Sequence, residues 1–452
     1  MQGIKTFFAF AVLTLALSGP FSGQALSSAP PNVGREERIA YLRGHAVPVR
    51  SLDPEDANFA DLEPLRRVIG DRRIVMLGEA THGDGSTFSA KVRLIKFLHE
   101  RLGFDVLALE SGLYDVPRIW SDLKAGEDPL RAVRSGVMED WADSVQVQPL
   151  WRYIAEQLKG PRPLELAGFD LQFTGRNGGE RLAQDLRGFL SKVALPPEAT
   201  QLAVRVSDPL DRLMRNILDF QRIPPGDRTS IRMAMEKLGQ AIEQTRSLSV
   251  PDGAERAYWV QLLKSSAVMM ELAWSIDFAA LGKQSLPSRV FNLRDRQMGE
   301  NFVWLAKQAY PGRKIIVWAG TSHILRNHAS ILNEPDPVTS MGDWVEKALG
   351  PEVYALGFTA YRGRYGKLGT SQTMDMEPAA ENSLEDLLFK AELEFAWLDL
   401  AVPGPDGLWL REPISSRPLR HEPKTADWTR LMDGIFFIRD MQPSTWIQSK
   451  EH

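Results

Sequence analysis

Short apolar runs recur along most of this chain, and helical patterns separate most of them. The runs are rich in β-branched residues, which is typical of buried β-strands. They lie at residues 73–77, 105–109, 164–168, 314–319, 353–357 and 435–438. Strands that alternate with helices form parallel or mostly parallel sheets. We therefore predict an α/β fold in which a mostly parallel central sheet is flanked by helices.

The strand pattern stops in the middle of the chain. Between about residues 195 and 286, apolar side chains recur at helical spacing, and turns such as Pro224-Pro225-Gly226 separate the helical segments. We interpret this region as a helical insertion that caps the site. Its methionine and tryptophan content fits either an apolar substrate surface or ordinary helix packing. Residues 37–452 are predicted to form a single catalytic domain that includes this insertion.

The first 25 residues have the composition of a secretory signal peptide. Lys5 is their only charged residue, residues 6–17 are almost wholly apolar, and Gly23-Gln24-Ala25 fits a cleavage site. The apolar run is shorter than the ~20 residues that a membrane span needs, and an uncleaved membrane anchor is the alternative. We expect an exported protein, periplasmic or secreted, with no stable membrane insertion after cleavage. Residues 26–36 are predicted to be a flexible leader.

Composition and missing motifs exclude several classes of function. The chain has no cysteine, which removes thiol nucleophiles, disulfides and thiolate metal sites. Its formal net charge is -4 and it has no long basic run, which argues against nucleic acid as a partner. It has no G-x-S-x-G, H-E-x-x-H, P-loop or G-x-G-x-x-G motif, so serine hydrolase, zincin and nucleotide-binding folds lose their usual support. We predict no cofactor.

Side chains suited to acid–base chemistry follow four of the predicted strands. They are Glu79, His82, Glu110, Asp170, Gln172 and His323. The carboxyl ends of parallel strands lie at one edge of the sheet, where ligands bind in open α/β folds. We therefore expect these side chains to converge on a site. The alternative is that polar residues follow strands simply because loops are polar.

Glu79 and His82 are the centre of this predicted site. They lie on a turn between the first strand and a helix predicted from about residue 87 to residue 102. A neutral imidazole, with a pKa near ~6.5, can take a proton from water. A neighbouring carboxylate can orient the imidazole or act as the base itself. Lys91 and Arg93 are predicted to help bind an anionic substrate group at the helix N-terminus, and a salt bridge is the alternative for Arg93.

The same side chains leave a metal site as an alternative. His82 and His323 with Glu79 and Glu110 make a plausible set of two nitrogen and two oxygen ligands. Their spacing does not match a metal-binding motif.

Several motifs of the chain resemble those of the erythromycin esterase family. They are Gly78-Glu79-Ala80-Thr81-His82-Gly83, Ala108-Leu109-Glu110-Ser111, Gly168-Phe169-Asp170-Leu171-Gln172, residues 292–298, residues 317–323, residues 354–358 and residues 436–440. In this order they cover about residues 45–446. The resemblance implies an α/β fold with a helical part. It also implies hydrolysis of a macrolide lactone, an antibiotic, by water that a histidine activates, without a covalent intermediate and without metal.

The resemblance assigns roles residue by residue. It implies that His82 is the histidine that activates water, with Glu79 beside it, and that His323 belongs to a distal histidine motif. The first histidine often seen in that motif is replaced here by Gly320, and an arginine often seen in the helix falls at Lys91.

Three hypotheses about function result. The first is an exported ester or lactone hydrolase in which His82, Glu79, His323 and Glu110 are catalytic, and His45, Lys91, Arg93, Asp170 and Gln172 bind the substrate. Within it, an ester other than a macrolide is an alternative substrate, and a turn residue is the alternative role of His45. The second is a metal-dependent hydrolase or peptidase on the same scaffold, as in the more distant ChaN-like and Tiki-like proteins. The third is a binding protein for a small exported ligand.

Overall fold

The computed structural model describes residues 33–193, 195–245, 253–276, 287–333, 336–401 and 404–447. The predicted signal peptide, residues 1–25, lies outside these residues, as does most of the predicted leader. None of the helices in the described ranges has the length and apolar character that a membrane span requires.

The structure divides into two compact units. The sheet unit consists of residues 33–110, Glu139–Glu165 and residues 313–447, and the helical unit consists of Ser111–Met138 and Leu166–Gly312. Residues 37–452, which were predicted to form a single domain with an insertion, contribute to both units.

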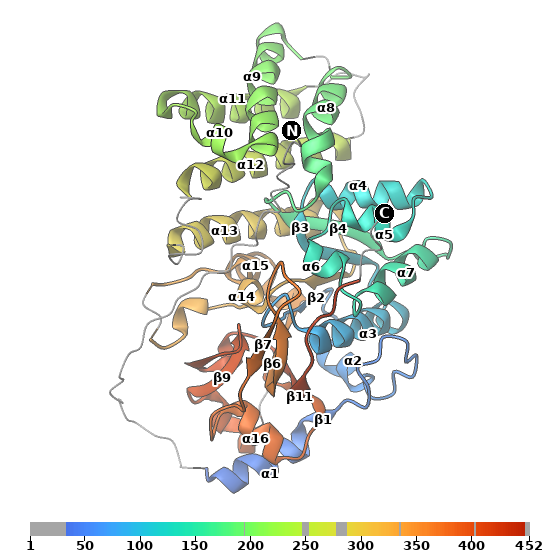
Figure 1. The fold of residues 1–452 in the computed structure, drawn as a ribbon, viewed down its shortest axis with the longest axis vertical. Helices are drawn as coiled ribbons and strands as arrows, with labels where there is room; N and C mark the ends of the chain where they lie inside the picture. Colours follow the sequence, from blue (N-terminus) through green and yellow to red (C-terminus); the bar gives the residue numbers. More distant parts are fainter. Residues whose placement is uncertain are drawn as a thin grey trace, which may run out of the picture. The chain divides into compact units, whose positions relative to one another are not determined.

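A mostly parallel sheet forms the core of the sheet unit (Figure 1). Its strands are ordered β1-β8-β11-β6-β2-β5-β3, with β7 beside β6. Strand β2 runs parallel to β5 and β6, β3 to β5, and β11 to β6, whereas β1, β7 and β8 pair antiparallel. Strands β9 and β10 form a separate hairpin. The predicted α/β fold with a mostly parallel sheet is confirmed.

The strands of this unit have the following bounds: β1 (Val47–Pro48), β2 (Ile74–Leu77), β3 (Val106–Gly112), β5 (Ile315–Trp318), β6 (Val353–Gly366), β7 (Thr373–Met376), β8 (Phe395–Asp399), β9 (Ile414–Leu419), β10 (Glu422–Ala426) and β11 (Gly434–Met441). Strand β3 ends in the helical unit. Strand β4 (Glu165–Asp170) begins in the sheet unit, where the Glu165 N–H donates to the carbonyl of Asp105, and continues in the helical unit.

Burial and register explain why the central strands define the site. Every residue of β2 and β5 is buried, because helices cover both faces of a parallel sheet and its strands become continuous apolar runs. Leu77 of β2 and Leu109 of β3 both lie opposite Trp318 of β5. The polar residues that follow these three strands therefore start at the same level, at one edge of the sheet.

The helices of the sheet unit connect and flank these strands. They are α1 (Arg35–His45), α2 (Pro64–Ile69), α3 (Gly85–Leu102), α6 (Glu139–Ala142), α7 (Gln148–Gln157), α14 (Thr321–Ile324), α15 (Met341–Leu349) and α16 (Leu384–Lys390), with short 3₁₀ turns at His328–Ser330, Gly350–Glu352, Pro405–Arg411 and Trp428–Arg430. The long helix α3 follows β2 and ends at Gly103, whose φ of 75° is the left-handed conformation typical of a residue after a helix.

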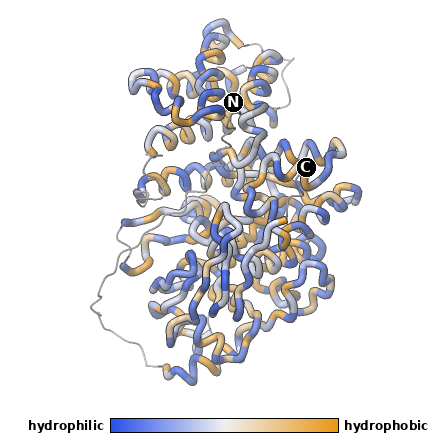
Figure 2. The backbone as a smooth tube through the Cα atoms, viewed as in Figure 1, coloured by the Kyte–Doolittle hydropathy of each residue, from blue (hydrophilic) through white to orange (hydrophobic). Residues whose placement is uncertain are grey.

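The helical unit contains the predicted insertion. Its helices are α4 (Asp115–Lys124), α5 (Pro129–Arg134), α8 (Arg176–Leu190), α9 (Pro197–Arg215), α10 (Ile217–Gln221), α11 (Pro225–Gln244), α12 (Gly253–Ser275) and α13 (Ser288–Trp304), which continues as a π-helical turn at Leu305–Ala309. Hydrophilic and hydrophobic residues alternate along these helices in Figure 2, as expected for helices that bury one face. The described part of the insertion is helical, as predicted.

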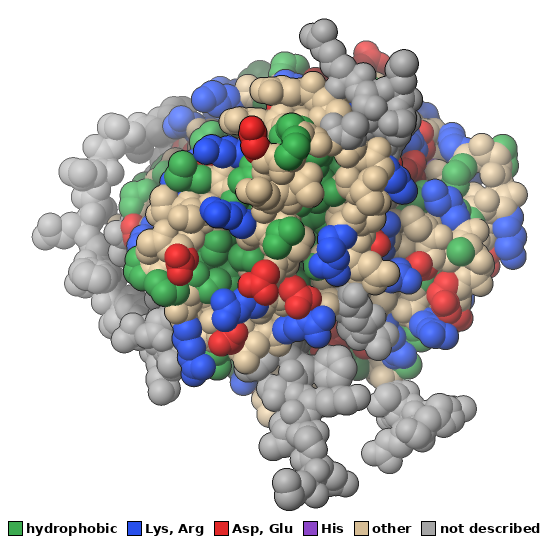
Figure 3. Space-filling view, turned by 90° about the horizontal axis from the view of Figure 1, so that it is seen from above, with side chains coloured by type: hydrophobic (Ala, Val, Ile, Leu, Met, Phe, Trp, Pro, Cys, Tyr) green, Lys and Arg blue, Asp and Glu red, His purple; other side chains and the backbone are tan. Residues whose placement is uncertain are grey.

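Charged side chains of both signs occur on the molecular surface. Figure 3 shows one face on which Lys and Arg are interspersed with Asp, Glu and hydrophobic side chains. A mixed surface of this kind agrees with the small net charge of -4.

Candidate active site

The turn between β2 and α3 is fixed by the ends of the neighbouring strands. The Gly78 N–H donates to the carbonyl of Leu356 in β6 at 2.9 Å, and the Thr321 N–H, just after β5, donates to the carbonyl of Glu79 at 2.8 Å. These bonds extend the parallel pairing of β2 by one residue toward β6 and by two residues toward β5. The backbone at Glu79 is therefore set by the sheet itself.

Glu79 is a buried carboxylate that accepts three hydrogen bonds from side chains. Glu79 is only 1% exposed. Oε1 accepts from Nδ1 of His82 at 2.6 Å and from Nε1 of Trp141 at 3.0 Å. Oε2 accepts from Nζ of Lys91 at 2.6 Å. Two of the donors carry or can carry positive charge, and together the three donors hold this carboxylate in one orientation.

The hydrogen bond to Glu79 sets the tautomer of His82. Because Nδ1 donates to the carboxylate, Nε2 of the neutral ring carries the lone pair that can accept a proton. Nε2 has no hydrogen-bond partner among the described residues. The edge of the ring packs on Trp141, with 5.4 Å between the ring centroids. His82 therefore has the orientation of a general base.

Charges around the turn shift the pKa values of His82 and Lys91 in opposite directions. Burial alone would lower the pKa of His82, but the hydrogen bond to Glu79 and the charges of Glu110 and Glu79 outweigh it, so the pKa lies above 6.5. Burial lowers the pKa of Lys91 from 10.5 to about 8, against the attraction of Glu79. The ammonium of Lys91 lies 4.3 Å from the ring centroid of Trp318, which adds a favourable contact for the charged form.

A second histidine–carboxylate pair lies beside the first. Nε2 of His323 is 3.1 Å from Oε1 of Glu110, and the Gly320 N–H donates to Oε2 of Glu110 at 2.8 Å. Both side chains are buried. Glu110 is the last residue of β3 within the sheet unit, and His323 lies in α14, directly after β5.

Gly320 lies where the two pairs meet. A β-carbon at this position would be 3.6 Å from Cε1 of His82, 3.5 Å from Cδ2 of His323 and 3.7 Å from Oε2 of Glu110. These are ordinary van der Waals distances, so a methyl group on Gly320 would fit between the two pairs. The side of Gly320 that carries no side chain thus faces Cε1 of His82, the ring carbon between Nδ1 and Nε2.

The structure thus brings together five of the residues predicted from the sequence. Glu79, His82, Lys91, Glu110 and His323 lie in one buried cluster of the sheet unit. Lys91 contacts Glu79 rather than an open surface, so its first role is to neutralise and orient that carboxylate.

Arg93 forms the salt bridge that was the alternative interpretation of this residue. Its guanidinium makes two hydrogen bonds to Asp61, at 2.9 and 2.7 Å, and donates to the carbonyls of Ser51 and Asn58. Arg93 is only 1% exposed. The described contacts occupy it fully with residues of its own unit.

His45 ends helix α1 and is exposed. Nδ1 is 2.9 Å from the carbonyl oxygen of Tyr41, and the two rings stack with 4.0 Å between centroids. Its described contacts are with its own helix and do not include the Glu79–His82 pair.

Asp170 and Gln172 belong to the helical unit. Asp170 ends β4, is buried, and forms an ion pair with Arg294 of α13 at 2.5 Å. Its Oδ1 also accepts from the Gln172 N–H at 3.0 Å. Gln172 is 3% exposed. Within this unit, the carboxylate of Asp170 connects β4 to α13.

Two residues of the cluster were not predicted from the sequence. Trp141 of α6 donates to Glu79, and the neighbouring Asp140 accepts from the Gly369 N–H at 2.9 Å. Burial raises the pKa of Asp140, while the hydrogen bond from Gly369 and the charge of His82 lower it. A single tryptophan among the acidic residues Glu139, Asp140 and Asp143 matches no motif, so the sequence offered no signal for this role.

The four side chains considered as alternative metal ligands form two histidine–carboxylate pairs, His82 with Glu79 and His323 with Glu110. In the described part of the chain, no group of three or more His, Cys, Asp or Glu side chains is arranged to hold a metal ion. The oxygens of Glu79 and Glu110 instead face nitrogen donors.

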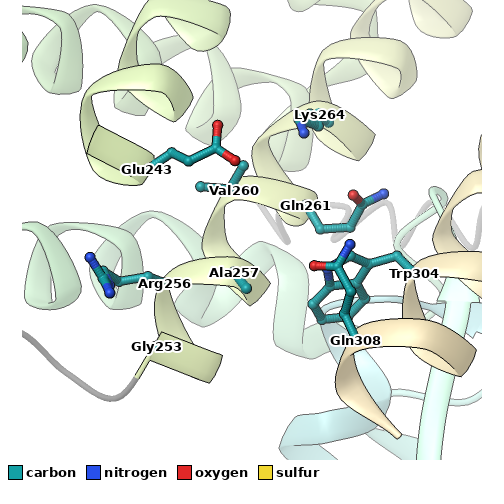
Figure 4. A pocket seen from close by; sticks show the side chains of 9 residues that line it. All are labelled: Glu243, Gly253, Arg256, Ala257, Val260, Gln261, Lys264, Trp304 and Gln308. Carbon is teal, nitrogen blue, oxygen red and sulfur yellow. The ribbon is translucent and has the colours of Figure 1, made fainter. Parts of the chain in front are cut away.

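A cavity of about 210 Å³ lies elsewhere, between α11, α12 and the π-helical turn of the helical unit (Figure 4). The charged side chains of Glu243, Arg256 and Lys264 line it together with Trp304. It contains none of the residues predicted for the site.

The chain is similar to several known proteins in sequence and in structure. The profile of the erythromycin esterase family matches residues 99–441, which begins after the Glu79–His82 turn. YbfO of Bacillus subtilis (strain 168), whose name gives hydrolase activity as provisional, is 27% identical over 450 residues, covering 93% of this chain and 95% of that protein. Erythromycin esterase type II of Escherichia coli is 22% identical over 346 residues, covering 73% of this chain and 78% of that protein.

A solved structure shows the same fold. A mutant of the erythromycin esterase EreC in its open conformation superposes with a TM-score of 0.66 at 16% identity, covering 87% of this chain and 97% of that one. With the family profile matched over more than half of its length, the chain belongs to the erythromycin esterase family and is an ester hydrolase.

Proposed function

We propose that the protein hydrolyses a carboxylic ester or lactone with water that His82 activates. The observation that carries this proposal is the orientation of His82. Glu79, held by Lys91 and Trp141, fixes the Nδ1 side of the ring, and Nε2 has no hydrogen-bond partner among the described residues. A base oriented in this way contributes roughly 10²–10⁴ to the rate.

In this mechanism the proton returns to the leaving group. Nε2 of His82 takes a proton from water as the water oxygen attacks the carbonyl carbon, and Glu79 stabilises the resulting imidazolium. The tetrahedral intermediate then collapses with cleavage of the carbon–oxygen ester bond. The departing alkoxide takes the proton from Nε2, giving an acid and an alcohol, which are parts of one molecule when the substrate is a lactone.

His323 and Glu110 would act on the other side of the reacting carbon. Nε2 of His323 lies 3.1 Å from Oε1 of Glu110, so a protonated His323 would place a positive charge near the developing oxyanion. Such preorganised charges are among the largest contributions to catalysis.

For the substrate, we propose a macrolide lactone. The family and the name of the Escherichia coli relative support this choice. A non-macrolide ester is the alternative, and the open position at Gly320, where the family often has a histidine, is the specific observation that favours it.

The test is incubation of the mature protein with macrolides of two ring sizes and with simple aryl esters, read by mass spectrometry with and without a chelator. A gain of one water by a macrolide, unaffected by the chelator, is the expected result. Hydrolysis of the aryl esters alone would exclude the macrolide, and loss of activity with the chelator would exclude a metal-free mechanism.

Variants identify the base. His82→Ala is expected to lower kcat by roughly 10²–10⁴ while the protein stays folded. His45→Asn is the matched control, because His45 is exposed and contacts Tyr41, and it is expected to retain activity. Full activity of His82→Ala would contradict the mechanism.

We also propose that the protein acts outside the cytoplasm, where it would intercept an antibiotic before entry and confer resistance. The composition of residues 1–25 supports export. Expression of the full chain followed by cell fractionation and mass measurement of its N-terminus tests this. A chain that begins at Leu26 in the periplasm or medium is expected, and an intact chain in the cytoplasm would contradict the proposal.

A further inference from the structure

The turn that carries Glu79 and His82 is held from outside by segments far along the chain. The carbonyl of Gly83 accepts two N–H groups, from Gly366 of β6 and from Ser444 near the end of the chain, each at 2.8 Å. A β-carbon at Gly83 would collide with the Gly366 carbonyl. These contacts fix the backbone just after His82.

The hairpin β9–β10 makes a third contact with the same turn. Its two connecting residues, Arg420 and His421, both have positive φ, 52° and 57°, as in the tight hairpin turns that usually use Asn or Gly. The Arg420 N–H donates to the carbonyl of Ala80 at 3.0 Å. Nε2 of His421 lies 2.8 Å from Oδ1 of Asp84. Two bulkier residues therefore occupy an unfavourable conformation at the point of contact with the turn.

Asp84 connects His421 to Thr81, the residue before His82, through hydrogen bonds. Asp84 is fully buried. Its Oδ1 accepts from Oγ1 of Thr81 at 2.7 Å, and its Oδ2 accepts from the Thr81 N–H at 3.1 Å. The chain of hydrogen bonds thus runs from His421 through Asp84 to Thr81, the neighbour of His82.

The bonding of His421 shows that this contact is specific. The ring is buried beside Tyr365, with 4.9 Å between centroids, and its Nδ1 has no hydrogen-bond partner among the described residues. A buried polar atom without a partner is unfavourable. The ring is therefore retained for the bond that its Nε2–H makes to Asp84 rather than for packing alone.

We propose that His421 is a positioning residue for catalysis, acting through Asp84 and Thr81 to hold His82 against Glu79. The proposal rests on the proposed function only in assigning His82 as the base. Small displacements of a catalytic group cost up to roughly 10²-fold in rate. The gain in rate from a fixed His82 therefore outweighs the unfavourable backbone conformation of the hairpin turn.

A pair of variants at position 421 tests the proposal. In His421→Asn the backbone conformation remains acceptable, but the short side chain does not reach Asp84. In His421→Gln the amide nitrogen lies near the position of Nε2 and can donate to Asp84. We expect a roughly 10- to 100-fold fall in kcat with little change in KM for His421→Asn, and substantial recovery for His421→Gln.

NMR titration of labelled histidines gives a second readout, independent of any substrate. The chain has seven histidines, so His82 can be assigned from the His82→Ala spectrum. In His421→Asn the pKa of His82 is expected to fall back toward 6.5, because its bond to Glu79 loosens. If His421→Asn does not fold, Thr81→Ala cuts the same chain of hydrogen bonds one link further on.

His99→Asn is the matched control. His99 is also a buried histidine of the sheet unit, bonded to Oη of Tyr153 at 2.6 Å and to the Arg162 carbonyl at 3.0 Å. It should lower thermal stability without changing kcat or the His82 titration. A folded His421→Asn with the wild-type kcat and His82 titration would overturn the proposal. If the wild type hydrolysed no ester, the proposed function would fail, while the titration would still decide the positioning role.

Discussion

At Gly320, a missing side chain leaves space between two imidazole rings. We predict that Gly320→Ala folds normally, because φ of -63° and ψ of 145° suit alanine and the new methyl group meets its neighbours at 3.5–3.7 Å. The free energy of unfolding should rise by about 0.4–1 kcal/mol, since the unfolded chain loses freedom. The kcat/KM should fall at least roughly tenfold, because the methyl group would lie 3.6 Å from Cε1 of His82 and would crowd a substrate bound against this ring. Denaturant unfolding and ester kinetics measure the two effects.

Gly44→Ala is the control for this prediction. Gly44 lies in helix α1, with nothing within 4 Å of a β-carbon there, so stability should rise without loss of activity. Unchanged kcat/KM in Gly320→Ala would show that the reacting group does not use this space.

The opposite pKa shifts of His82 and Lys91 predict a narrow pH optimum. The base must be neutral, so kcat/KM should rise as the pH passes through the His82 pKa, above 6.5. Above about pH 8, Lys91 loses its proton and Glu79 loses the cation that orients it, so activity should fall. A pH–rate profile measures both limbs.

Lys91→Arg separates the two limbs. An arginine stays charged throughout this range, so the alkaline limb should move to higher pH while the acid limb stays in place. An alkaline limb that does not move would assign the loss to another group.

Residue type and order were sufficient to predict that Glu79, His82, Glu110 and His323 lie together, because each is at or just after the end of a strand of the parallel sheet. The role of Trp141 could not be predicted, since its position relative to Glu79 depends on α6, a short helix far from the turn in sequence. The two interpretations of Arg93 could be separated only by the position of Asp61. Local pattern identifies which residues can react, and tertiary contacts decide which partners they have.

At the scale of an element, α3 is tied to the segment before β2 by Arg93. We predict that Arg93→Met lowers the free energy of unfolding by about 3–5 kcal/mol, because it leaves the buried carboxylate of Asp61 without its charge partner. The KM of the folded enzyme should stay unchanged. Urea unfolding and kinetics over a range of substrate concentrations check both expectations.

Arg101→Met is the matched control on the same helix. Arg101 is exposed, and surface substitutions of this kind change stability by about 0.5 kcal/mol or less. A raised KM in Arg93→Met with unchanged stability would return Arg93 to the substrate site.

Some strands could be predicted from the sequence and others could not. The central strands β2 and β5 are buried apolar runs, and their sequence shows it. Strands β9 and β10 contain Pro418 and Pro423 and alternate irregularly between buried and partly exposed residues. They exist because they pair with each other, which is a property of the hairpin and not of either segment. The contact of His421 with Asp84 could not be predicted from the sequence for the same reason, because it depends on the formation of this hairpin.

For the whole molecule, local periodicity located the helical region but not the extent of the helical unit. The predicted insertion covered residues 195–286, whereas the unit also includes Ser111–Met138 and continues to Gly312. Asp115 shows how these distant segments are joined. This residue of α4 is fully buried and accepts the N–H of Gly178 at 2.8 Å and the N–H of Thr174 at 3.2 Å.

Asp115 makes the stability of the molecule depend on pH. Burial raises its pKa from 3.8 to about 8, although its backbone hydrogen bonds lower it. Between these values the folded chain holds a proton that the unfolded chain releases, so the stabilisation is complete below pH 3.8 and is lost as the pH rises through about 8. The free energy of unfolding should therefore fall with pH, with this group contributing up to about 1.4 kcal/mol per pH unit.

Denaturant unfolding at several pH values between about 5 and 8 measures this dependence. In Asp115→Asn the contribution of the carboxyl disappears, so the slope should become less negative, whatever the absolute stability of the variant. Asp122→Asn, a partly exposed residue of the same helix, should keep the wild-type slope. Equal slopes in the wild type and Asp115→Asn would mean that Asp115 is ionised in the folded protein, because its two backbone N–H donors then outweigh its burial.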